Sequence, residues 1–246
     1  MNLTFDEMRK LQQKKYREKF GYFIAEGEHL VQELENASAL NPALHDAQLF
    51  ICSEESRFAR SFSTHTINAK QMARICDTQT PQGIFALVPV AALGKRPPSA
   101  EKEKVVYLHE VQDPGNLGTI LRTLAWFGAA RCLLSAGSVD PFNPKVVRAS
   151  MGAVFHVPIE IDVPLESIVA RYPRIAALDM NGIDIADSRF AQNDVYVFGN
   201  EARGVPMQAL ETIRAEMFTI PGKGSIESLN LGTVVSICAY ALARAT

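Results

Sequence analysis

The sequence predicts two α/β domains, the C-terminal one built on a parallel sheet with helices on both faces. Five short apolar runs follow residue 104, and helical stretches separate most of them, a pattern typical of parallel sheets. The runs lie at residues 105–109, 131–135, 174–178, 194–198 and 216–220. The stretch LGKRPPSAEKEK, with its adjacent prolines and dense charge, indicates a linker. We therefore expect an N-terminal domain at 1–92, a linker at 93–104 and a second domain at 105–246.

The N-terminal domain is expected to be small and mixed in secondary structure. Residues 5–20 are predicted to form one basic helix, followed by a strand at 22–25 and a helix at 28–35. Apolar runs at 48–52 and 83–89 predict further strands. These segments together indicate a small α/β fold.

Composition excludes several classes of protein. Hydrophobic residues make up 47% and charged residues 21% of the 246 residues, which excludes a disordered chain. The four cysteines form no CxxC pair and the five histidines are dispersed, so we expect neither a disulfide framework nor a metal site. No apolar run reaches membrane-spanning length and the N-terminus lacks a targeting pattern, which predicts a cytoplasmic protein.

Binding to a polyanion would have to depend on local basic patches, because the formal net charge is only −2. The predicted helix at 5–20 is the candidate, with the basic residues Arg9, Lys10, Lys14, Lys15, Arg17 and Lys19. An ordinary solvated helix face, balanced by Asp6, Glu7 and Glu18, explains the same pattern equally well.

Unusual loops follow two of the predicted strands. In the first, Asn116 is expected to cap the following helix, and Arg122 projects from that helix about one turn later. A helix N-terminus with a nearby arginine can hold an anion, although a plain capped helix is the simpler explanation. In the second, Gly199 and Gly204 bracket Glu201 and a nearby arginine directly after a buried strand.

A third polar segment precedes the last helix. It runs from Ile220 through a glycine-rich stretch to Ser228, Leu229 and Asn230. The glycines suit a loop that wraps a ligand with backbone groups, and Ser228 and Asn230 would stand at the start of the helix. The last helix is apolar around most of its circumference, which indicates burial, in part by a second subunit.

Taken together, the three segments resemble the SpoU (TrmH-like) branch of the SPOUT RNA methyltransferases. The matching strings are DPGNLGTILRTLAWFG at 113–128, VFGNEARGVP at 197–206 and IPGKGSIESLNLGTVVSICAYALA at 220–243, in the family's order. The absence of GxGxxG and GxxxxGK[ST] supports neither a dinucleotide site nor a P-loop. The N-terminal string KYREKFGYFIAEGEHLVQE is also similar to the substrate-binding domain, of ribosomal-protein-like fold, found in some members.

The resemblance implies an S-adenosylmethionine-dependent enzyme that methylates a ribose 2′-hydroxyl of RNA, and the N-terminal extension favours ribosomal RNA over transfer RNA. It also implies a deep trefoil knot in the C-terminal domain and a homodimer. The cofactor-binding residues it implies are Leu178, Gly199, Ile220 and Leu229. The catalytic and RNA-contacting residues it implies are Asn116, Arg122, Glu201, Ser228 and Asn230. The same reaction on transfer RNA, and a non-catalytic RNA-binding relative, stay open as alternatives.

Overall fold

The computed structural model describes residues 3–52, 61–93, 103–128, 130–223 and 228–245. Most of the predicted linker and part of the third polar segment (residues 94–102 and 224–227) lie outside the described residues. The boundaries proposed for the linker therefore stay a prediction.

Contacts within the chain form two compact units. Unit 1 comprises Met1–Pro97 and Asp140–His156, and unit 2 comprises Pro98–Val139 and Val157–Thr246. The segment Asp140–His156 belongs to unit 1 by its contacts, although it lies within the sequence of the C-terminal half. The chain therefore leaves unit 2 after Val139 and returns to it at Val157.

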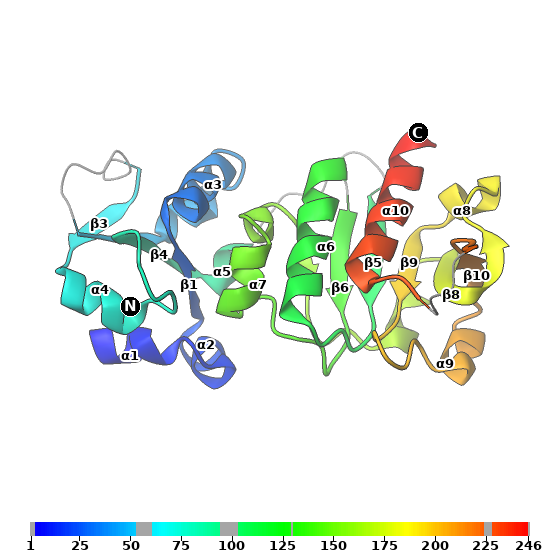
Figure 1. The fold of residues 1–246 in the computed structure, drawn as a ribbon, viewed down its shortest axis with the longest axis horizontal. Helices are drawn as coiled ribbons and strands as arrows, with labels where there is room; N and C mark the ends of the chain where they lie inside the picture. The colour runs from blue at the N-terminus through cyan, green and yellow to red at the C-terminus, as the bar shows by residue number, and fades with distance from the viewer. Residues whose placement is uncertain (1–2, 53–60, 94–102, 129, 224–227, 246) are drawn as a thin grey trace. The chain divides into compact units, whose positions relative to one another are not determined.

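Unit 1 contains a four-stranded mixed sheet in the order β1-β4-β2-β3 (Figure 1). Its strands are β1 (Tyr22–Glu26), β2 (Gln48–Ile51), β3 (Ser63–Thr66) and β4 (Ile84–Pro89). β4 pairs antiparallel with β1 and β2, and β2 pairs parallel with β3. The helices are α1 (Phe5–Lys10), α2 (Lys14–Phe20), α3 (Glu28–Ser38), η1 (Pro42–Asp46), α4 (Ala69–Ile75), α5 (Val90–Leu93), α7 (Pro144–Ala149) and η3 (Ala153–Phe155).

The single basic helix predicted over 5–20 is wrong, because the chain breaks after Lys10 into α1 and α2. Leu11 is buried in the core at the break, and its carbonyl accepts a hydrogen bond from Arg17 Nη1 at 2.6 Å. The Arg17 guanidinium also pairs with Asp140, with an Nη2–Oδ2 distance of 2.6 Å. Arg17 is therefore a buried structural cation and not part of an exposed basic face.

The segment Asp140–His156 completes the core of unit 1. The ring of Phe23 in β1 stacks on Phe142 at a centroid distance of 5.0 Å and on Phe155 at 6.2 Å. Arg148 pairs with Asp77 at 2.8 Å. Burial of these rings explains why the segment packs with unit 1.

Unit 2 contains six parallel strands in the order β10-β8-β9-β5-β6-β7, which confirms the predicted parallel sheet (Figure 1). The strands are β5 (Lys104–Leu108), β6 (Ala130–Leu134), β7 (Ile159–Glu160), β8 (Ile175–Asp184), β9 (Val195–Phe198) and β10 (Glu216–Thr219). The helices are α6 (Pro114–Phe127), η4 (Leu165–Ile168), α8 (Ser188–Gln192), α9 (Met207–Thr212) and α10 (Leu231–Arg244).

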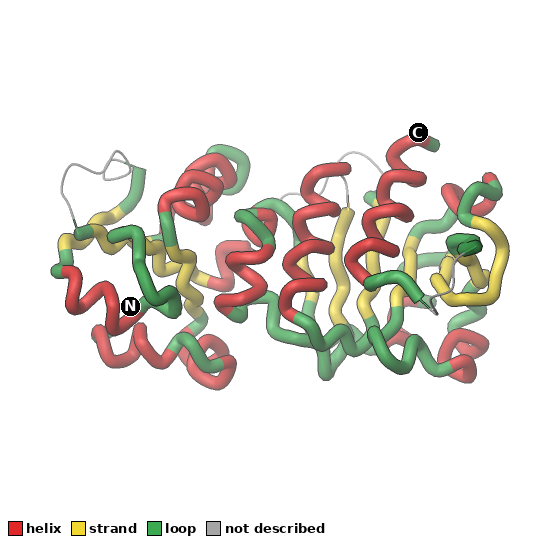
Figure 2. Tube along the Cα trace, viewed as in Figure 1, coloured by secondary structure: helices red, strands yellow, loops and turns green. Residues whose placement is uncertain are grey.

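Helices cover this sheet on both faces, as the unbroken apolar strands require. Helices α6 and α10 pack side by side in front of it (Figures 1 and 2). Ile168 of η4 and Leu210 of α9 share a core cluster with Tyr107 of β5. The Tyr107 hydroxyl donates to the carbonyl of Val163 at 2.8 Å.

Strand β8 is longer than the predicted run at 174–178 because it resumes pairing after an interruption. Its register with β10 jumps from Ala177 to Ile183. Gly182 lies against β10, where an added Cβ would stand 2.7 Å from the carbonyl oxygen of Met217. Leu178 thus marks the point at which β8 stops pairing with β9.

Candidate active site

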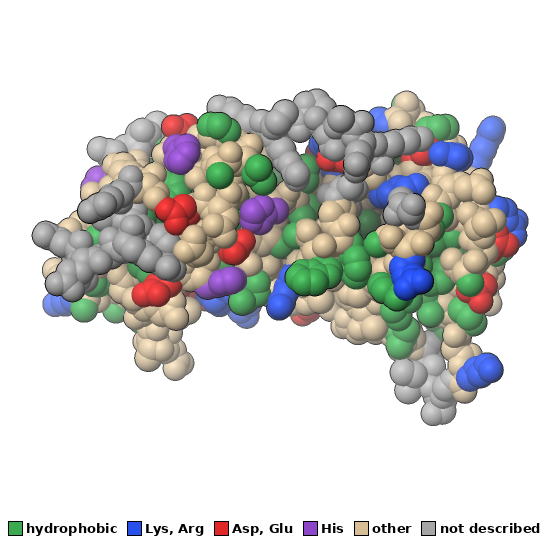
Figure 3. Space-filling model, turned by 90° about the horizontal axis from the view of Figure 1, so that it is seen from above, with side chains coloured by type: hydrophobic (Ala, Val, Ile, Leu, Met, Phe, Trp, Pro, Cys, Tyr) green, Lys and Arg blue, Asp and Glu red, His purple; other side chains and the backbone are tan. Residues whose placement is uncertain are grey.

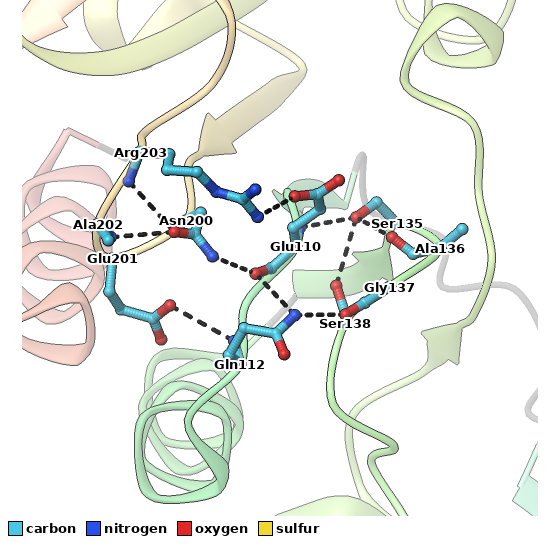
Figure 4. A network of polar contacts seen from close by, with 10 residues as sticks. All are labelled: Glu110, Gln112, Ser135, Ala136, Gly137, Ser138, Asn200, Glu201, Ala202 and Arg203. Atoms are coloured by element: carbon cyan, nitrogen blue, oxygen red, sulfur yellow. Dashed lines mark hydrogen bonds and ion pairs between the residues drawn. The ribbon is translucent and has the colours of Figure 1, made fainter.

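Polar side chains gather at the carboxyl ends of β5, β6 and β9, the edge at which parallel α/β sheets bind ligands (Figure 4). Glu110 follows β5 with a φ of 50°. Its N–H donates to Ser135 Oγ after β6 at 2.7 Å, and its carbonyl accepts from Asn200 Nδ2 after β9 at 2.7 Å. Glu110 therefore connects the ends of β5, β6 and β9 through hydrogen bonds.

The loop after β9 folds back sharply on itself. Asn200 and Gly204 exchange backbone hydrogen bonds of 3.1 and 2.8 Å. A Cβ on Gly199 would lie 2.3 Å from the carbonyl carbon of Gly204, so no larger residue fits. Gly199 is predicted to bind the cofactor, and the close approach of Gly204 also requires a residue without a side chain at this position.

Two side chains in this network were not singled out from the sequence. Asn200 is buried, and its Oδ1 accepts from the N–H groups of Ala202 and Arg203. Glu110 accepts from Arg203 Nη2 at 2.6 Å. The sequence signals for them are Glu110 directly after the apolar run at 105–109 and Asn200 two positions after the run at 194–198.

The predicted cap of α6 is wrong. Asp113 is the N-cap, with Pro114 as the first helical residue, and its Oδ1 accepts from the N–H of Asn116 at 2.7 Å. Asn116 thus lies inside the first turn, and its own side chain is free for other contacts. A proline at the first helical position is common and removes an N–H that would have no partner.

Asn116 joins the three polar segments. Its Nδ2 donates to Glu201 Oε1 at 3.0 Å, and its Oδ1 accepts from Asn230 Nδ2 at 2.8 Å. Glu201 also accepts from the N–H groups of Gln112 and Asp113, both at 3.4 Å. The structure therefore brings together three of the five residues assigned to catalysis and RNA contact.

The packing of α6 against α10 explains why Asn230 meets Asn116. Asn230 caps α10 by accepting from the N–H groups of Gly232 and Thr233 at 2.9 and 3.4 Å. A Cβ added to Gly232 would lie 3.3 Å from Thr119 Cγ2, so the two helices approach closely. Thr123 and Ser236 hydrogen-bond between the helices at 2.9 Å.

The other two predicted residues, Arg122 and Ser228, are exposed. No hydrogen bond or ion pair joins the side chain of either residue to another described residue. Arg122 lies on the solvent side of α6, so its guanidinium is available to a substrate. Ser228 precedes the α10 cap.

The residues assigned to cofactor binding lie after strands of the same sheet. Leu178 and Ile220 are half-buried, beside the end of the β8–β9 pairing and directly after β10. Leu229 is 43% exposed before α10. The backbone N–H and C=O of Gly199, Ile220 and Leu229 form no hydrogen bond with another described residue.

The two cysteines of unit 2 are buried. Burial raises the pKa of Cys132 and of Cys238 to about 12, so both thiols stay protonated at neutral pH. Within the described ranges, no three His, Cys, Asp or Glu side chains are grouped as metal ligands would be. Nor does any described helix have the length and apolar character to cross a membrane.

A family model described as the SpoU rRNA Methylase family matches residues 103–240. The chain belongs to this family. A second model, the MRM3-like substrate binding domain, matches residues 2–86. The predicted family, the α/β fold with its parallel sheet and the N-terminal substrate-binding domain are thereby confirmed.

One relative is similar in sequence to this chain over nearly its whole length. The 23S rRNA (guanosine(2553)-2′-O)-methyltransferase RlmP of Bacillus subtilis is 29% identical over 251 residues, which cover 98% of this chain and 96% of RlmP. Mitochondrial rRNA methyltransferase 3 of Mus musculus is 34% identical over 164 residues, covering 64% of this chain and 39% of its own.

Solved structures agree with this fold. An AdoMet-bound rRNA methyltransferase from Sinorhizobium meliloti superposes with a TM-score of 0.79 at 28% identity, covering 98% of this chain and 94% of its own. A TrmH-family protein from Porphyromonas gingivalis has a TM-score of 0.82 at 27% identity, with both chains fully covered.

Proposed function

We propose that this chain transfers the methyl group of S-adenosylmethionine to a ribose 2′-hydroxyl of RNA, with ribosomal RNA favoured over transfer RNA. The observation that carries the proposal is the chain of hydrogen bonds from Glu201 through Asn116 to Asn230, which unites the three family segments at one sheet edge. RlmP and the mitochondrial relative are both named as rRNA methyltransferases, which favours ribosomal RNA.

The residues at the sheet edge fit the methyl donor. Gly199, Ile220 and Leu229 offer backbone donors and acceptors that no other described residue uses. The half-buried side chains of Leu178 and Ile220 provide apolar surface beside them. When bound, S-adenosylmethionine supplies an activated methyl group on a sulfonium, and the chain's own residues orient the acceptor.

Asn116 is suited to orienting the ribose. An amide has two N–H donors and two acceptor lone pairs, and Glu201 and Asn230 take one of each. The remaining N–H and lone pair can meet a ribose hydroxyl while both neighbours fix the amide plane. Such positioning accounts for a large part of catalysis, up to roughly 7–11 kcal/mol in well-oriented systems.

Arg122 is proposed to stabilise the alkoxide that develops as the hydroxyl loses its proton, or to hold an adjacent phosphate. The guanidinium of Arg122 is exposed, and none of the ion pairs among the described residues includes it. A guanidinium keeps its own proton at neutral pH, so it is better suited to electrostatic stabilisation than to accepting a proton. Ser228 and Asn230 would complete the contact with RNA.

A homodimer is part of the proposal because large apolar side chains are exposed on the α6–α10 pair. Trp126 of α6 is 83% exposed and Tyr240 of α10 is 53% exposed. Hydrophobic side chains are visible at the surface of unit 2 beside scattered Lys and Arg (Figure 3). A second copy could cover these rings, and Trp126→Glu should then shift the protein from dimer to monomer in sedimentation.

The deep trefoil knot and a cytoplasmic location stay predictions.

Titration calorimetry with S-adenosylmethionine tests the proposed reaction class. Binding is expected, and its absence would favour the alternative of a non-catalytic RNA-binding relative. Mapping ribose methylation across total RNA with and without the gene then identifies the substrate. Loss of one methyl in transfer RNA, with ribosomal RNA unchanged, would select the transfer-RNA alternative.

A further inference from the structure

An aromatic pair on α2 lies among lysines that form no ion pair with an acid within the described residues. The rings of Tyr16 and Phe20 stack with centroids 6.0 Å apart and planes at 20°. Lys10 and Lys15 Nζ lie 5.6 and 5.9 Å from the Tyr16 ring centroid, and Lys19 Nζ lies 5.3 Å from that of Phe20. We call these five residues the α2 platform.

The acids of the same segment are engaged elsewhere. Glu7 forms the capping box with Thr4, and these hydrogen bonds are the main reason that its pKa lies below the usual value. Asp6 pairs with Arg74 at 3.4 Å and Glu18 with Lys14 at 3.7 Å. None of these three acids forms an ion pair with Lys10, Lys15 or Lys19.

No ion pair joins Lys10, Lys15 or Lys19 to an acid among the described residues. The charges of Lys10 and Lys19 contribute to lowering the pKa of Glu7, and their ammonium groups lie over the neighbouring rings of Tyr16 and Phe20. Lysines of α1 and α2 thus converge around the two rings. The break at Leu11 produces this arrangement.

The platform has a rigid base. Phe20 is half-buried and packs against the core cluster that contains Met8, Leu11 and Ile24. Tyr16 is half-buried and stacks on Phe20. Arg17, between them in sequence, is fixed by Asp140 and by the carbonyl of Leu11. The Tyr16 ring is therefore held in place before any ligand binds.

We propose that the α2 platform binds an unpaired stretch of the RNA substrate, with a base stacked on Tyr16 and phosphates on Lys10, Lys15 and Lys19. This inference rests on the proposed function and names the surface of unit 1 that holds the RNA. Base–aromatic stacking suits unpaired nucleotides, since bases in a duplex are already stacked on each other. Lysines supply the charge that a backbone of phosphates requires.

The test uses the full chain and fluorescence anisotropy with a short single-stranded oligoadenylate, beside an RNA duplex of matched length. Tyr16→Leu should weaken oligoadenylate binding about tenfold, and Tyr16→Phe should restore it, because stacking needs the ring and not the hydroxyl. The triple change Lys10→Gln, Lys15→Gln and Lys19→Gln should lower the slope of log affinity against log salt by about 2, at about 0.7 for each lost phosphate contact.

Matched controls lie on neighbouring helices of the same unit. Phe5 on α1 is 40% exposed, with no stacked ring or lysine over it among the described residues, so Phe5→Leu should leave affinity unchanged. Lys70 on α4 is exposed, and Lys70→Gln should leave the salt slope nearly unchanged. Circular dichroism melts confirm that each variant folds.

The proposal is overturned if folded Tyr16→Leu binds oligoadenylate as the unchanged protein does, or if it loses duplex binding equally. It is also overturned if Phe5→Leu has the same effect as Tyr16→Leu. Calorimetry with S-adenosylmethionine is independent of these results. Failure to bind S-adenosylmethionine refutes the methyl-transfer proposal and leaves the role of Tyr16 in RNA binding to be decided by the anisotropy measurements.

Discussion

Asn230 donates a hydrogen bond to Asn116 over 2.8 Å, although 114 positions separate the two residues in the chain. The contact exists because α6 and α10 begin at the same end of the sheet and pack side by side along their lengths. Asn230 has two functions there, since its Oδ1 caps α10 while its Nδ2 holds Asn116. These functions can be separated by substitution.

Asn230→Asp keeps the acceptor that caps α10 and removes the donor to Asn116. Aspartate is as good an N-cap as asparagine, so the melting temperature should hardly change. Methyl transfer under single-turnover conditions should fall about tenfold or more, because a carboxylate facing the Asn116 carbonyl oxygen turns the amide away. Asn143→Asp, at the cap of α7, is the matched control and should leave the rate unchanged.

Arg122 should affect the reaction and not the fold. It is exposed, so Arg122→Ala should keep the melting temperature while lowering the single-turnover rate about 10²- to 10³-fold, as loss of one charge-stabilising group does elsewhere. Arg244→Ala, an exposed arginine near the end of α10, provides the control. A near-normal rate for Arg122→Ala with saturating RNA would refute the proposed role.

The residues that could be anticipated from the sequence are those whose contacts are local or repeat along the chain. Short apolar runs separated by helical stretches indicated the parallel sheet, and the loops after β5 and β9 indicated the site. The pair Asp113-Pro114 is a local signal for the start of α6, because aspartate is a favoured N-cap and proline a favoured first helical residue.

Other features depend on contacts between distant parts of the chain. The break after Lys10 depends on Arg17, whose carboxylate partner is Asp140, 123 positions away. The extension of β8 depends on Gly182 fitting against Met217 of β10. Asp140 and Met217 lie far along the chain from Arg17 and Gly182. The periodicity of residues 5–20 and 174–178 therefore predicts one unbroken helix and one short strand.

Gly199 and Gly222 should respond in opposite ways to the same substitution. A Cβ on Gly199 meets the backbone of Gly204 at 2.3 Å, whereas no atom of another described residue lies within 4 Å of a Cβ on Gly222. Gly199→Ala should therefore lower the melting temperature by about 5 °C or more, from overpacking of at least about 2 kcal/mol. Gly222→Ala should leave it unchanged. Equal melting temperatures for the two variants would contradict the close return of the β9 loop.

The buried pair of Arg17 and Asp140 makes the segment Asp140–His156 a structural part of unit 1. Arg17 and Asp140 have side chains only 4% and 10% exposed. Asp140→Ala leaves the guanidinium buried with the Leu11 carbonyl as its remaining partner, which should cost about 3–5 kcal/mol of unfolding free energy.

Adding Arg17→Met to Asp140→Ala should recover much of that loss, because the unpaired buried charge is then gone. The exposed pair of Asp6 and Arg74 is the matched control, and Asp6→Ala should cost less than about 1 kcal/mol. Denaturant unfolding of the two single variants and the double variant measures these differences. If the double variant were less stable than Asp140→Ala alone, the guanidinium would be stabilising unit 1 through its other contacts, and the ion pair would not be what holds the segment.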